Sequence, residues 1–92
     1  MRRIIKKILP QYFAEVISGK KTFELRKDED QAEEGDVLIL REWDGEKYTG
    51  NAVLTTITYV LRGVPQYGLM DGYCIIGIKK HGLCYFIPEG KE

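Results

Sequence analysis

The stretch VLILREWDGEKYTGNAVLTTITYVLR, Val37 to Arg62, decides the fold expected for this chain of 92 residues. Its first seven residues, 37–43, are mostly apolar and predict a strand, and Asp44-Gly45 directly after them is a strong turn signal. Residues 52–62 predict a second, longer strand, because they are rich in β-branched side chains. The centre of the fold is therefore expected to be a pair of adjacent strands.

Elements on the N-terminal side of this pair are shorter. Residues 3–9 predict a strand, and Pro10 suits the first turn of a helix, where its missing N–H costs nothing. Within 10–19 the apolar residues recur at helical spacing, and Gly19 is a typical helix stop. The expected helix is about two turns long and needs tertiary packing to persist. Its apolar stripe consists of Tyr12, Phe13, Val16 and Ile17.

On the C-terminal side, residues 63–72 predict a loop, and two strands follow at 73–80 and 83–88. A two-residue turn at His81-Gly82 would join them as a terminal hairpin. The whole pattern predicts the α+β class, with one short N-terminal helix and about five or six strands that close or nearly close a small antiparallel or mixed barrel, because closure removes exposed strand edges. The length fits a single domain over residues 1–92.

Composition narrows the class of protein. The chain is 43% hydrophobic and 30% charged, as globular domains are, and its formal net charge is zero. Residues 1–27 hold eight Lys or Arg against two acids, whereas 28–46 hold nine acids against one base. The two cysteines and one histidine lack metal-ligand spacing, so no metal or cofactor is expected. No stretch has the length of a signal peptide's apolar run or of a membrane span, which favours the cytoplasm.

The stretch GKKTFELR, Gly19 to Arg26, carries the chemistry. Its period of two sets Thr22, Glu24 and Arg26 on one face of a strand, while Phe23 and Leu25 point the other way and are expected to face the core. Lys21 sits where the helix ends and the strand begins. A carboxylate between two cations is held ionised, which makes it a good hydrogen-bond acceptor and a poor general base.

This stretch fits the pattern GxKxxExR at Gly19, Lys21, Glu24 and Arg26, and it resembles the signature of the ASCH domain family. The flanking stretches agree: they are SGKKT at 18–22, EGDVLILREWDG at 34–45, YGL at 67–69 and GYCIIGI at 72–78. The resemblance covers roughly residues 4–80 and implies a PUA-like β-barrel with a cleft beside the motif. It also implies binding of RNA, of a nucleotide or of a modified nucleoside.

One branch of the resembled family deacylates N4-acetylcytidine nucleosides. It uses the motif lysine and a threonine three positions later, with a glutamate from a helical insertion. Here Glu24 stands at the threonine position, and the loop 63–72 is too short for the insertion. Hydrolysis would require Glu24 to activate water while Lys21 stabilises the oxyanion, or Thr22 to act as nucleophile. Binding is therefore the first hypothesis, hydrolysis the second, and a protein-interaction module whose charges only secure the helix-to-strand corner the third.

Several aromatic residues are secondary candidates. Tyr67 and Tyr73, in and beside the loop 63–72, are candidate ligand-binding residues that could cap a base, or they could close the barrel end. Trp43 and Tyr48 straddle the Asp44-Gly45 turn and are expected to form a cross-strand pair, with a stacking platform for a base as the alternative. Tyr59, on the long strand, is expected in the core.

Overall fold

The computed structural model describes residues 1–85, with the side chains of residues 1–82. One α-helix, one short 3-10 helix and five strands follow in chain order: β1 (Arg3–Ile8), α1 (Pro10–Ile17), β2 (Phe23–Lys27), β3 (Val37–Trp43), β4 (Tyr48–Arg62), η1 (Pro65–Tyr67) and β5 (Tyr73–Tyr85). The α+β class and the strand count expected from the sequence are confirmed.

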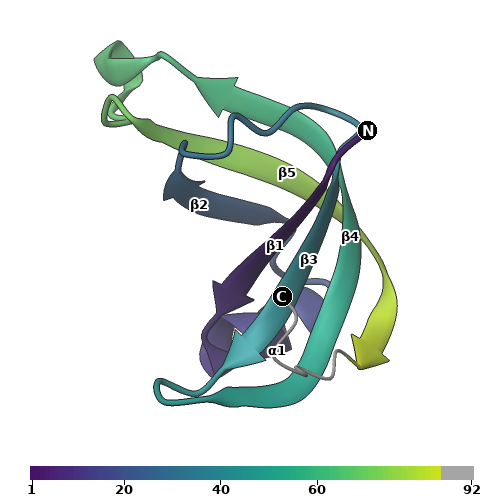
Figure 1. The fold of residues 1–92 in the computed structure, drawn as a ribbon. Coiled ribbons are helices and arrows are strands. Elements are labelled where there is room, and N and C mark those ends of the chain that lie inside the picture. The colour runs from purple at the N-terminus through teal and green to yellow at the C-terminus, as the bar shows by residue number, and fades with distance from the viewer. Residues whose placement is uncertain (86–92) are drawn as a thin grey trace.

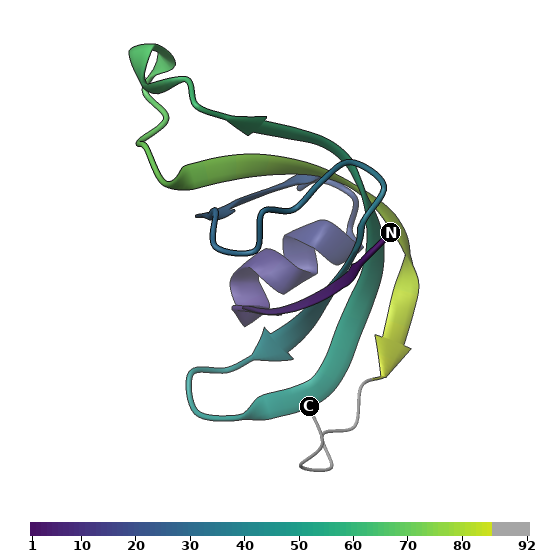
Figure 2. The same ribbon diagram turned by 45° about the horizontal axis from the view of Figure 1, so that its top comes forward.

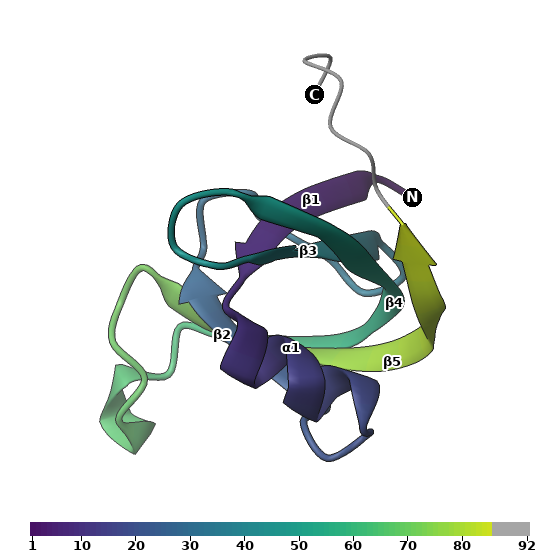
Figure 3. The same cartoon turned by 90° about the horizontal axis from the view of Figure 1, so that it is seen from below.

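The five strands form one sheet in the order β1-β3-β4-β5-β2. Pairing is antiparallel except between β1 and β3, which run parallel. The sheet curls into a half-barrel around a common interior, and α1 lies across one end of it (Figures 1 and 3). Because β1 and β2 stand at opposite ends of the strand order, each keeps one unpaired edge. The helix between them connects these two edge strands.

The helix follows its sequence signals. Pro10 is in its first turn and Gly19, with φ 86°, follows its end. Gly19 donates its backbone N–H to Val16 O at 3.1 Å, which satisfies one of the last helical carbonyls. Phe13 and Val16 are buried against the sheet, whereas Tyr12 is 45% exposed. The core that the helix covers consists mainly of Ile4, Ile8, Phe13, Val16, Leu38, Leu40, Val53, Ile57, Cys74, Ile76 and Ile78.

The terminal hairpin expected at His81-Gly82 is wrong. β5 continues through these residues and remains paired with β4, because β4 is 15 residues long and offers a partner along its whole length. Thr55 pairs with Lys80 and Leu54 with Gly82, so His81 is the extra residue of a bulge. The last part of the expected second strand, 86–88, lies outside the described residues.

The core position expected for Tyr59 is also wrong, since this residue is 61% exposed. A second register shift lies between Ile57, which is buried and points inward, and Tyr59. One extra residue in a strand reverses the alternation that follows it. Tyr59 therefore points outward although it is two positions from an inward residue.

Candidate functional site

Strand β2 has its charged residues inside and its apolar residues outside. Glu24 is buried at 4% exposure, whereas Phe23 is 46% and Leu25 59% exposed. The expectation that Phe23 and Leu25 face the core is therefore wrong. The register gives the reason: Glu24 pairs with Ile76, whose side chain points inward, and directly paired residues share a face. The period of two was correct, but it could not tell which face was inside.

The carboxylate of Glu24 lies between two cations. Oε2 accepts a hydrogen bond from Lys21 Nζ, and Oε1 accepts one from Arg26 Nε at 3.0 Å. The Glu24 side chain is 5% exposed, and those of Lys21 and Arg26 are 17% and 24% exposed. Charge-assisted bonds of this kind are stronger than neutral ones, and they compensate for the desolvation of the carboxylate. The three residues form one cluster, called here the KER cluster.

The KER cluster also joins the two edges of the sheet. Arg26 Nη2 donates to Lys7 O of β1 at 2.5 Å, and Lys21 Nζ donates to Phe23 O at 2.7 Å. A single side chain thus crosses from β2 to β1, where no backbone pairing between the two strands exists. The cluster holds the open side of the half-barrel at a defined width.

A cleft of about 470 Å³ opens beside the KER cluster. Its walls come from the end of β1, the start of α1 and the length of β2, and its lining residues are Lys7, Ile8, Leu9, Tyr12, Lys21, Phe23, Glu24, Leu25 and Arg26. Three cations and one carboxylate are thereby combined with two aromatic rings. Lys21 Nζ lies 5.7 Å from the Tyr12 ring centroid and 5.0 Å from that of Phe23, within cation–π range.

The unpaired edge of β2 adds backbone groups to this cleft. Ile78 N–H donates to Thr22 O at 2.9 Å and Asp28 N–H to Gly72 O at 2.8 Å, so the even-numbered residues of this segment bond to β5. Because bonding alternates along an antiparallel strand, the N–H and C=O groups of Phe23 and Leu25 point to the free edge. Lys21 Nζ already donates to the carbonyl of Phe23, and Leu25 is among the residues that line the cleft.

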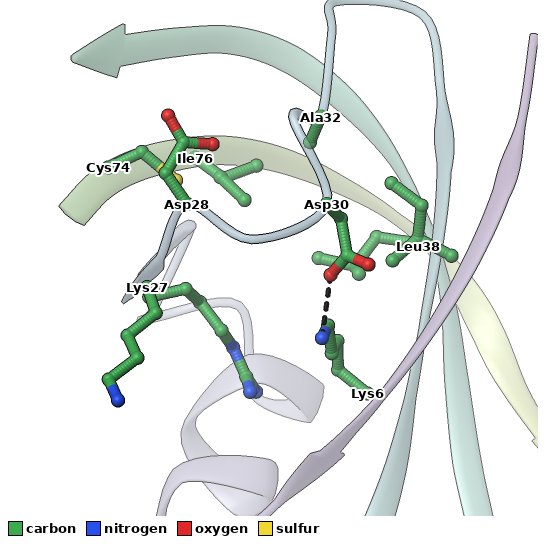
Figure 4. A pocket seen from close by; sticks show the side chains of 10 residues that line it. Lys6, Lys27, Asp28, Asp30, Ala32, Leu38, Cys74 and Ile76 are labelled. Atoms are coloured by element: carbon green, nitrogen blue, oxygen red, sulfur yellow. Dashed lines mark ion pairs between the residues drawn. The ribbon is translucent and has the colours of Figure 1, made fainter. Parts of the chain in front are cut away.

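A second, much smaller hollow of about 20 Å³ lies between β2, β1 and the loop after β2, and it is large enough for about one water molecule. Figure 4 shows Lys6 and Asp30 meeting across it, with Nζ and Oδ2 2.6 Å apart. The Arg62 guanidinium beside Asp28 lowers the pKa of that carboxyl, and burial raises the pKa of the Cys74 thiol. Arg26 lines both hollows and so separates them.

The remaining predicted site residues do not join the KER cluster. Thr22 is exposed and contributes its carbonyl to β5, and its side chain is not part of the cleft lining. Tyr67 is 82% exposed on η1, which projects beyond the sheet (Figures 1 and 2). Tyr73 is half-buried opposite Lys27. Neither tyrosine lines the cleft or the small hollow.

Residues that sequence reasoning missed supply the apolar part of the cleft. Leu9 and Tyr12 bracket Pro10, and Tyr12 was assigned to the helix stripe that faces the core. The sequence did contain one sign of this role: Tyr12 lies in the first turn of the helix. There the apolar stripe of the helix extends beyond the edge of the sheet. Lys7, in β1, also lines the cleft, and its Nζ lies 4.0 Å from the Trp43 ring centroid.

The expected aromatic pair is confirmed. The rings of Trp43 and Tyr48 meet edge to face, with centroids 4.9 Å apart and planes at 71°. The guanidinium carbon of Arg41, a buried residue, lies 3.5 Å from the Tyr48 centroid. These rings therefore pack within the β3–β4 turn region, and Lys7 connects them to the cleft.

Among the side chains described, those of residues 1–82, no group of three or more His, Cys, Asp or Glu could hold a metal ion. Within the same residues, no helix has the length and apolar character needed to cross a membrane.

Comparison with known proteins identifies a family. An uncharacterised 12.9 kDa protein from the GpA 3′ region of Escherichia phage P2 is 44% identical over 54 residues, which are 59% of this chain and 50% of the relative. This chain thus spans about half the length of the curated relative that it matches. Residues 5–78, which include most of β1, all of α1, β2, β3 and β4, and β5 as far as residue 78, match the family model described as a domain of unknown function, DUF3850. The chain therefore belongs to the DUF3850 family.

Proposed function

We propose that the cleft beside β2 binds a nucleotide, a modified nucleoside or a short stretch of RNA, with the KER cluster as its polar floor. The observation that carries this proposal is a nearly buried carboxylate, Glu24, held between two cations that also line a cleft of about 470 Å³. Ligand sites in proteins have volumes of roughly 300–1,000 Å³ and combine apolar walls with a few fixed polar groups.

Each part of the cleft corresponds to a part of such a ligand. The Glu24 carboxylate can accept from an exocyclic amine or a ribose hydroxyl, since its oxygens have acceptor sites beyond the two bonds to Lys21 and Arg26. Lys7, Lys21 and Arg26 provide the positive charge that a phosphate group requires. The rings of Tyr12 and Phe23 offer flat apolar surface for a base.

The resemblance of residues 19–26 to the ASCH signature supports the same function. It implies a PUA-like barrel, and the five-stranded half-barrel with one short helix is compatible with that fold. In this proposal the motif residues Lys21, Glu24 and Arg26 contact the ligand. Thr22, Tyr67 and Tyr73 are not assigned to the cleft, because their side chains do not line it.

The geometry favours binding over hydrolysis. For hydrolysis Glu24 would have to position a water molecule and take its proton, whereas each of its carboxylate oxygens is already held by a hydrogen bond from a cation, which suits a fixed acceptor for a ligand. The alternative nucleophile, the Thr22 hydroxyl, does not line the cleft. Cleavage of an acylated nucleobase such as N4-acetylcytidine is therefore less well supported by this arrangement than binding is.

The proposal is tested by calorimetric titration with the four ribonucleoside monophosphates, cytidine, N4-acetylcytidine and a mixed-sequence RNA octamer. We expect at least one of these to bind, and Glu24→Gln and Arg26→Ala to weaken its affinity about tenfold or more. Matched controls are Glu42→Gln and Arg3→Ala, which replace the same residue types outside the cleft and should bind as the unmodified protein does.

Three results would contradict this function. Binding by none of the probes would leave the cleft without a nucleotide ligand. Unchanged affinity together with a lower melting temperature in the Glu24 and Arg26 variants would show that the KER cluster is only a structural clamp at the helix-to-strand corner. Release of acetate from N4-acetylcytidine, lost in Lys21→Ala, would show that the protein is an amidohydrolase.

A further inference from the structure

The outward face of β2, β5 and β4 carries two exposed aromatic rings on either side of a glycine. Phe23 pairs with Gly77, and Gly77 pairs with Tyr59, so the three residues form one row across three strands. Directly paired residues point to the same side of a sheet. Phe23 is 46% and Tyr59 61% exposed, so both rings stand on the outer surface of the half-barrel.

The glycine between the rings has a structural cause. A Cβ atom at Gly77 would lie 2.9 Å from Thr58 Oγ1, at the bulge where the register of β4 and β5 shifts. A side chain at this position would require Thr58 to move, because the Thr58 hydroxyl lies beside the glycine on the outer face. Neighbouring strands are 4.7–4.9 Å apart, so the rings project from strands separated by about 10 Å. The exposed faces of the two rings, with the Thr58 hydroxyl between them, form the surface on which a base can stack.

The surroundings of this row are apolar and basic. The next row consists of Leu25, Ile75 and Leu61, of which Leu25 is 59% exposed. The charged residues at outward positions of β2, of β5 up to residue 79 and of β4 from residue 56 are Lys27 and Lys79, and no carboxylate is among them. The face therefore carries positive charge alone.

This face is continuous with the cleft, because Phe23 and Leu25 belong to both. A ligand that leaves the cleft past Phe23 passes from the cations Lys21 and Arg26 directly onto the row that ends at Tyr59. Exposed aromatic rings combined with lysines are the means by which proteins hold single-stranded nucleic acid, since every base can stack and every phosphate is negative.

We infer that the face formed by Phe23, Gly77 and Tyr59, called here the aromatic row, stacks the bases of a single-stranded nucleic acid whose adjoining nucleotide occupies the cleft. The inference rests on the proposed function of the cleft and extends it from one nucleotide to a chain. A partner protein with an apolar surface is the competing occupant, and the absence of carboxylates on the face favours a polyanion over it.

The test uses a fluorescein-labelled RNA octamer of mixed sequence, the matching DNA octamer, and the nucleoside monophosphates, at 50 and 200 mM salt. We expect Tyr59→Ala to bind the octamer about tenfold more weakly and to leave mononucleotide affinity unchanged, because stacking on one ring is lost. Tyr59→Phe keeps the ring and should retain the affinity. Leu54→Ala is the matched control, since it shortens an exposed residue on the same strand outside the aromatic row.

The results separate this inference from the function of the cleft. Loss of octamer binding in Tyr59→Ala, with octamer affinity unchanged in Glu24→Gln, would support stacking on the aromatic row and refute the contribution of the cleft. Octamer affinity that is equal in Tyr59→Ala and the unmodified protein, at an equal melting temperature, would overturn the aromatic row alone. Failure of both octamers to bind, with self-association on size exclusion that Tyr59→Ala abolishes, would overturn it in favour of a protein interface.

Discussion

The interior of the half-barrel is apolar where β3 meets β4 and charged where β2 forms the open edge. Leu40 and Val53, which pair directly, are completely buried. Across the same interior, the inward positions of β2 are Glu24 and Arg26, and the apolar residues of this strand face outward. A strand paired on both edges is closed off from water, whereas an edge strand beside a cleft stays reachable by water and can keep charges inside. Under the proposed function, β2 serves ligand contact more than core packing.

The largest effect on stability is expected in the apolar part of the interior, where β3 meets β4. Leu40→Ala removes a completely buried side chain, so we expect the free energy of unfolding to fall by about 2–5 kcal/mol. Urea denaturation followed by circular dichroism measures this change. The control is Leu54→Ala on the outer surface, which should cost far less. Equal losses in the two variants would show that the β3–β4 interior is not tightly packed.

Removing a charge on the β2 side of the interior should lower the free energy of unfolding by less than Leu40→Ala does. Glu24→Ala leaves Lys21 and Arg26 without their shared carboxylate, and we expect a loss of about 1–3 kcal/mol, since both cations remain partly exposed. A double-mutant cycle with Arg26→Ala should give a coupling of about 1 kcal/mol or more. The cycle for Lys6 and Asp30, a more exposed pair, should give less. Additive effects at Glu24 and Arg26 would mean that their bond contributes nothing to stability.

Low pH should weaken the carboxylate interactions of the loop that follows β2 before it weakens the apolar packing between β3 and β4. The backbone N–H groups of Arg2, at 2.9 Å, and Glu33, at 3.0 Å, lower the pKa of the Asp36 carboxyl, and the Arg62 guanidinium lowers that of Asp28. A carboxyl whose pKa is lowered on folding adds stability above its unfolded pKa, about 4, and this stability disappears as pH falls through the lower folded value.

Urea titrations between pH 6 and pH 2 should therefore show falling stability at the acid end, with a smaller fall in Asp36→Asn. The variant is expected to be less stable than the unmodified protein near neutral pH, and the two curves should converge in acid. Parallel curves throughout this range would exclude Asp36 as a source of the pH dependence.

The smallest effect is expected on the outer face of β2. Leu25→Ser replaces a residue that is 59% exposed, so we expect a change in unfolding free energy within about 0.5 kcal/mol. Thermal melts of this variant and of Leu40→Ala provide the direct comparison. A loss above about 2 kcal/mol in Leu25→Ser would mean that this side chain is covered in solution.

Much of the fold was predictable from local patterns. The strands expected at 3–9, 37–43 and 52–62 correspond to β1, β3 and most of β4, which begins earlier, at Tyr48. The helix beginning at Pro10 and the stop at Gly19 were also expected, because apolar periodicity, turn residues and capping residues act within a few positions of one another. Of the site, the clustering of Lys21, Glu24 and Arg26 was also accessible, since two residues share a strand face and the third ends the preceding turn.

The errors have a common cause. Alternation along a strand shows that its two faces differ, but it does not show which face points into the interior. For β2, only the pairing with β5 decided that Glu24 is inside. The bulge at 57–59 reversed the alternation of inward and outward side chains in β4, and at the bulge around His81 the strand β5 continued where a turn was expected. Neither bulge has a local signal in the sequence. Each of these outcomes depended on a partner strand that is distant in sequence.

The sequence by itself determined which segments are strands or helix and which charged residues lie close together, because these properties come from neighbours along the chain. Only the tertiary structure decided that the sheet stays open between β1 and β2, that charge lies inside and aromatic rings outside, and that a cleft results. The physical reason is that register and curl follow from the pairing of all five strands together, and no single strand contains that information.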